Sequence, residues 1–108
     1  MLILITIKLN LIPSYQFFQK QIKDGVIGDV KHVSANFGVV IGDVDRVAKK
    51  SMGGGTMLDI GIYCLNIVEF VFDGEKPEKV LAVGHLNQEG VDESVSASFL
   101  FKNCKLFK

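Results

Sequence analysis

The chain has 108 residues, of which 48% are hydrophobic and 22% are charged, so it is long and apolar enough to fold around a modest core. Its 12 basic and 12 acidic residues give a formal net charge of zero, and no basic stripe stands out, which argues against a nucleic-acid partner. The two cysteines lack metal-ligand spacing and are too few for a disulfide framework. A reducing compartment, the cytoplasm, is therefore expected.

The first twelve residues, MLILITIKLNLI, are almost entirely apolar. They are about half as long as a membrane-spanning helix, and they lack the leading positive charge and small-residue cleavage site of a secretory signal. Their alternating pattern favours a buried strand. Residues 1–12 are therefore predicted to be a divergent, strand-like N-terminal segment with no membrane partner, and residues 13–108 the main domain.

The next segment has the features of a helix. Pro13 suits a first helical position, and Ser14 is a plausible cap. Phe17, Phe18 and Ile22 share one broad apolar face. A glycine, Gly25, follows where the helix is predicted to end.

Residues 29–40 alternate in the manner of a strand, and residues 41–55 form a predicted loop. The loop carries Asp43, Asp45 and Arg46, which either rim a pocket or belong to a solvated surface. The two histidines of the chain fall on predicted strands without metal-ligand spacing, so no metal is expected.

A long helix is predicted over residues 56–72, stopped by Asp73 and a glycine. Strands follow over 78–86 and 94–101, joined by the polar turn 87–93. The predicted fold is α+β, with an incomplete, mostly antiparallel sheet and helices packed on one face.

The stretch GGGTMLDIGIYCLN opens the long helix and carries its most unusual residues. Asp59, Tyr63 and Asn66 stand at i, i+4 and i+7, which places them on one face of a mostly apolar helix. They either form a polar functional stripe or only cap the helix and satisfy local hydrogen bonds. The glycines, including Gly61 inside the helix, allow a ligand or another element to approach the backbone. A phosphate site is poorly supported, because GGG matches neither G-x-G-x-x-G nor a P-loop.

This helix resembles the hallmark helix of the glucose–fructose oxidoreductase / inositol dehydrogenase / MocA family. The family pattern is GG, a short apolar step, and then D-x-G-x-H/Y-x-x-D/N. The Tyr in DIGIYC, with IPSYQFFQKQIKDGVIGDVKHVSANFG, DRVAKKSMGGG and FDGEKPEKVLAVGHLNQEGVDESVSASF, is similar to the trans-1,2-dihydrobenzene-1,2-diol dehydrogenase branch. The resemblance covers about residues 12–102.

The resemblance implies the substrate and dimerisation domain of a Rossmann-type oxidoreductase. That branch oxidises trans-dihydrodiols of aromatic hydrocarbons to catechols with NADP, and it also acts on D-xylose. Tyr63 falls at the catalytic general acid/base, Asp59 and Asn66 at residues that orient the substrate, and Phe37 at an aromatic wall. An ordinary core position remains the alternative for Phe37. A free phenol has a pKa of about 10, so it needs a positive neighbour to exchange a proton near neutral pH. In the family, a lysine beside the tyrosine provides that charge.

The departures from the family limit what the chain is expected to do. It has no G-x-G-x-x-G, so by itself it is expected to bind no cofactor and to lack activity. The family lysine precedes the hallmark helix in an E-K-P motif, whereas Glu75-Lys76-Pro77 follows it here. Lys76 is therefore expected to be a solvated turn residue.

The alternative function is that of a non-catalytic module or a truncated product. Its expected partner is a second copy of the chain or a full-length relative. Pairing with either partner is expected because the strand 94–101 has an apolar face, and in the family the sheet continues with further strands.

Overall fold

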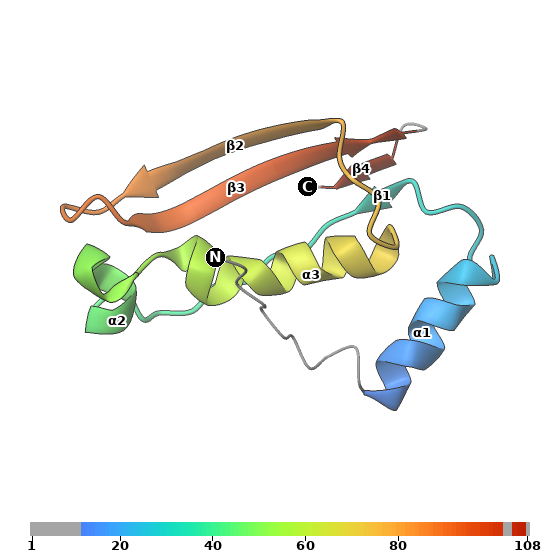
Figure 1. Cartoon of the computed structure of the whole chain (residues 1–108), viewed down its shortest axis with the longest axis horizontal. Coiled ribbons are helices and arrows are strands. Elements are labelled where there is room, and N and C mark those ends of the chain that lie inside the picture. Colours follow the sequence, from blue (N-terminus) through green and yellow to red (C-terminus); the bar gives the residue numbers. More distant parts are fainter. Residues whose placement is uncertain (1–11, 103–104, 108) are drawn as a thin grey trace. The chain divides into compact units, whose positions relative to one another are not determined.

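The structure, a computed structural model, describes residues 12–102 and 105–107. The chain divides into two compact units, Met1–Val30 and Lys31–Lys108, which are described separately (Figure 1). The predicted N-terminal strand over residues 1–12 falls almost wholly outside the described residues.

The first unit contains helix α1, Pro13–Lys23, which confirms the predicted helix. Pro13 begins the helix, but its N-cap is Ile12, so the cap predicted at Ser14 is wrong. The helix begins at Pro13 because the fixed φ of proline suits the first helical position and its missing N–H needs no partner. Gly25 follows with φ 72°, the left-handed conformation that ends a helix.

The second unit contains a four-stranded sheet in the order β1-β4-β3-β2. The long hairpin of β2, Lys79–Leu86, and β3, Asp92–Phe101, is antiparallel, as predicted. The short strand β4, Lys105–Phe107, pairs antiparallel with β3 and parallel with β1, His32–Val33. The sheet is thus mostly antiparallel, with one parallel pair at its edge.

The strand predicted over residues 29–40 is much shorter in the structure, where only His32–Val33 pairs. The reason is that the partner of β1 is the three-residue strand β4, so the ladder ends after two residues. The chain beyond β1 continues without strand pairing and lines a cavity through residues 35–38.

The long helix lies on one face of the sheet (Figure 1). It begins as a π-helical turn, η3, Met57–Gly61, and continues as α3, Ile62–Val71. Asp73 and Gly74, with φ 52° and 73°, turn the chain away at its end, as predicted. The helix joins the sheet through the rings of Phe72 and Phe101, whose centroids lie 4.4 Å apart.

The predicted loop 41–55 contains two short helices, α2, Asp45–Ala48, and η2, Lys50–Met52. Val47 of α2 is buried. This burial stabilises helical turns that the polar composition of the segment did not predict. Val91, just before β3, is also buried.

Within the described residues, one stretch, Lys50–Val71, has the length and composition to cross a membrane. It is not one continuous helix, because Gly53 has a left-handed φ of 70° and the two residues after it are not helical. The unbroken part from Thr56 to Val71 would be roughly 24 Å long at 1.5 Å per residue. That is shorter than the bilayer core of about 30 Å, so this stretch is weak evidence for a span.

Candidate functional site

The three glycines before the long helix bring separate parts of the chain into close contact. A Cβ on Gly54 would lie 2.3 Å from the backbone oxygen of Val47, and one on Gly55 would lie 2.3 Å from Oδ1 of Asp92. Gly55 also has φ 135°, which L side chains rarely adopt. The glycines therefore allow another protein element to approach, which was one of the two alternatives that the sequence left open.

Asp92 caps the helix that these glycines precede. Its Oδ2 accepts a hydrogen bond of 2.6 Å from the backbone N–H of Met57. The Thr56 hydroxyl donates to the backbone oxygen of Glu93 at 2.8 Å, which ties the same turn to β3. A carboxylate is favoured at a helix N-terminus, and here it occupies the place that a bound phosphate would take.

Asn87 holds the turn between β2 and β3 against α2. Its Nδ2 donates to the backbone oxygen of Ala48 at 2.8 Å, and its Oδ1 accepts from the backbone N–H groups of Glu89 and Val91. The hairpin turn, α2 and the helix start are thus joined by side-chain hydrogen bonds.

Two ion pairs extend from α2 in different ways. Arg46 pairs through Nη1 with Oδ1 of Asp59, whose side chain is only 23% exposed. Lys49 pairs with Asp45 at 2.8 Å, and both of these side chains are well exposed. The hydrogen bond from Lys49 to Asp45 raises the pKa of the lysine. Arg46 is therefore the basic group of this segment that reaches the long helix.

Tyr63 lies beside Phe37, and their rings meet edge to face with centroids 5.7 Å apart. Tyr63 is 42% exposed and Phe37 is 51% exposed, so the pair lies at a surface. This exposure contradicts the alternative that Phe37 is an ordinary core residue. The third predicted polar residue of this stripe, Asn66, is instead buried.

Asn66 has an uncommon environment for a polar side chain. Within the part of the chain that the structure describes, its Oδ1 is fully enclosed and lacks a hydrogen-bond partner. A buried unpaired acceptor costs about 1–3 kcal/mol, so this oxygen lowers the stability of the chain unless another segment supplies a donor.

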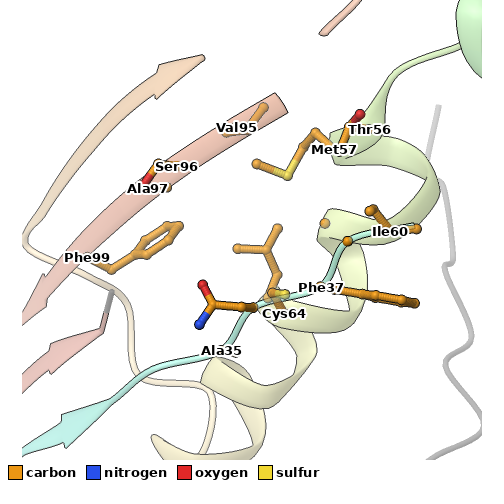
Figure 2. A pocket seen from close by; sticks show the side chains of 14 residues that line it. Ala35, Phe37, Thr56, Met57, Ile60, Cys64, Val95, Ser96, Ala97 and Phe99 are labelled. Carbon is orange, nitrogen blue, oxygen red and sulfur yellow. The ribbon is translucent and has the colours of Figure 1, made fainter. Parts of the chain in front are cut away.

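The helix cavity, of about 340 Å³, lies between the long helix and β3 (Figure 2). Met57 and Phe99 project into the space between these elements, whereas the ring of Phe37 points away from β3. Val95, Ala97 and Phe99 share the β3 face predicted from the alternating sequence. The lining of the helix cavity is mainly apolar and includes Ile60, Cys64 and Leu65.

The loop cavity, of about 300 Å³, lies between residues 37–48, η3 and the start of β3. Asp59 lines it, together with Phe37 and Asn87. A ring, a carboxylate and an amide thus border one space large enough for a small molecule.

Phe37 meets the ring of Tyr63 and lines the loop cavity with Asp59, whereas Tyr63 is not among the residues that line either cavity, and Asn66 is buried. The sequence placed Arg46 in the preceding loop without identifying its ionic partner. It gave no signal for the cap by Asp92, because this contact joins positions far apart in the chain.

The group that approaches Gly61 is the Met57 sulfur, 2.5 Å from where a Cβ would be, and not a ligand. No cluster of three potential metal-ligating side chains occurs in the described residues.

Residues 15–107 match the model of the GFO/IDH/MocA C-terminal domain. The chain belongs to this family. The match agrees with the α+β fold and places the helix, the glycines and the sheet in a C-terminal domain of an oxidoreductase.

Several curated relatives share one name. The chain is 49% identical to the trans-1,2-dihydrobenzene-1,2-diol dehydrogenase of Xenopus tropicalis over 84 residues, which are 78% of this chain and 26% of the relative. It is 39% identical to the enzyme of that name from Danio rerio over 94 residues, 87% of this chain and 28% of the relative. The chain is 37% identical to the enzyme of that name from Homo sapiens over 84 residues, which are 78% of this chain and 25% of the relative. The chain spans about a quarter of the length of these relatives.

Proposed function

We propose that the chain supplies the substrate side of an NADP-dependent dihydrodiol dehydrogenase. Its substrates would be trans-dihydrodiols of aromatic hydrocarbons, oxidised to catechols, with D-xylose as a further substrate. The observation that carries the proposal is the position of Phe37, which lines the loop cavity with Asp59 and meets the ring of Tyr63 edge to face. The names of the relatives support the same chemistry.

Each side chain has a distinct task in this proposal. Tyr63, in its phenolate form, would take the proton of the substrate hydroxyl that is oxidised, and the cofactor would accept the hydride. The carboxylate of Asp59 accepts a hydrogen bond from the second hydroxyl, and Phe37 packs against the substrate ring. By resemblance Asn66 would orient the tyrosine or the substrate, but its enclosed Oδ1 lies outside both cavities, so the geometry does not support direct contact with the substrate.

The described residues do not fit a dinucleotide. The only glycine-rich helix start among them is already capped by Asp92, which repels a phosphate. The cofactor, NADP by resemblance, would therefore be held by residues outside this chain, and the chain alone would be inactive. We propose the cytoplasm as its location, in line with the free thiol of Cys64 and with a cysteine count too low for a disulfide framework.

A chimera tests the proposal. Residues 15–102 replace the matching segment of the Xenopus tropicalis enzyme, and reduction of NADP⁺ is followed with trans-1,2-dihydrobenzene-1,2-diol. Turnover by the chimera is expected. A folded, cofactor-binding chimera without turnover would contradict the function.

A second candidate function, a self-associating module, is favoured by strand β2. Every residue of this strand is exposed, and it lies at one edge of the sheet. Val80, Leu81 and Val83 are at least half exposed. An uncovered edge strand is a template for another chain, and the near-zero net charge opposes association little. Analytical ultracentrifugation of the chain is expected to detect dimers, and a monodisperse 11.9 kDa monomer would contradict this function.

A further inference from the structure

We propose that Arg46 is a positioning residue for Asp59, holding its carboxylate at the loop cavity so that it accepts a hydrogen bond from a substrate hydroxyl. This inference rests on the proposed function and assigns a part in it to a residue outside the hallmark helix. Arg46 acts through Asp59 and is not itself a catalytic residue.

The contact that carries the inference joins two distant segments. Arg46 belongs to α2 and donates from Nη1 to Oδ1 of Asp59 in η3. The Asp59 side chain is 23% exposed and lines the loop cavity, so it is both restrained and accessible to a ligand. Because Arg46 occupies Oδ1, Oδ2 is available to accept from a hydroxyl.

The backbone that carries Arg46 is held on two sides. Gly55 donates its backbone N–H to the oxygen of Val47 at 2.9 Å, and Asn87 donates its amide to the oxygen of Ala48 at 2.8 Å. Val47 itself is buried. The guanidinium therefore extends from an anchored turn, which lowers the entropy cost of fixing the carboxylate.

The second ion pair of this segment is a natural comparison. Lys49 and Asp45 pair within α2 and its C-cap, with side chains 47% and 65% exposed. Such exposed i,i+4 pairs contribute little and reach no cavity. Of these two ion pairs, only Arg46–Asp59 includes a residue that lines the loop cavity, so a substitution of Lys49 provides a matched control.

The test uses the full 108-residue chain and two NMR measurements. The Hα–Hβ couplings of Asp59 report its χ1 rotamer, and titration with trans-1,2-dihydrobenzene-1,2-diol reports binding. Arg46→Met is expected to average the Asp59 rotamer and to weaken diol binding about tenfold, the effect of one charge-assisted hydrogen bond. Arg46→Lys should restore part of both, and Lys49→Met should change neither.

The outcomes separate this inference from the proposed function. A fixed Asp59 rotamer and unchanged diol affinity in Arg46→Met would overturn the role of Arg46, even if Asp59→Asn abolished binding. Unaltered affinity in Asp59→Asn would instead contradict the substrate role of Asp59 on which the inference rests. Amide spectra that match the wild-type chain exclude unfolding as the cause.

Discussion

Removing the carboxylate that caps the long helix should destabilise the chain measurably. Asp92 accepts a 2.6 Å hydrogen bond from Met57 N–H at a part-buried position. A hydrogen bond to a charged group contributes about 1.5–3 kcal/mol, and loss of a helix cap costs about 0.5–2 kcal/mol. Because these two values describe the same contact, Asp92→Ala should lower the free energy of unfolding by about 2 kcal/mol.

Urea denaturation and thermal melting measure this change. For a domain of this size, a loss of about 2 kcal/mol corresponds to a fall in Tm of roughly 8–16 °C. Asp92→Asn keeps an acceptor oxygen without its charge and should cost about half as much. Glu93→Ala removes a neighbouring exposed carboxylate and should stay within about 0.5 kcal/mol of wild type. An Asp92→Ala chain as stable as the Glu93→Ala control would refute the capping role.

Three further results are expected. Gly54→Ala places a Cβ 2.3 Å from the Val47 oxygen and should cost about 1–3 kcal/mol in urea denaturation, whereas Gly42→Ala, with open space around it, should cost far less; equal losses would contradict the packing described. Asn87→Ala should lower the free energy of unfolding by about 1–3 kcal/mol and speed amide exchange in the hairpin turn, with exposed Gln88→Ala as control, and unchanged exchange would exclude the anchoring role. Titration of the chain with NADPH should give no saturable change in nicotinamide fluorescence, and saturation at micromolar cofactor would show a dinucleotide site that the glycine turn does not explain.

The elements of the fold that local patterns determine were predictable from the sequence. The apolar alternation of β3 and the left-handed Asp73 and Gly74 after α3 reflect backbone preferences of nearby residues. The length of β1 was not predictable, because it depends on a partner strand more than seventy positions away. The helical turns of α2 were likewise hidden, since burial of Val47 depends on tertiary packing.

The candidate site divides in the same way. Helical spacing placed Asp59 and Tyr63 on one face, but it could not place Phe37 beside the tyrosine, because that contact joins separate segments. Spacing also placed Asn66 on this face, but it could not show that Asn66 is buried while Tyr63 remains exposed. Arg46 and Asp92 act through contacts between distant segments, which no local motif encodes.

Oxidation of a trans-dihydrodiol by the chimera carrying Tyr63→Phe tests the central claim most directly. The substitution keeps the ring that packs against Phe37 and removes only the hydroxyl that would carry the proton. The account predicts a fall in kcat of about 10²- to 10⁴-fold, the usual contribution of a general acid/base, with the melting temperature and NADP⁺ affinity unchanged. A kcat equal to that of the unsubstituted chimera would contradict it and leave Tyr63 a purely structural residue.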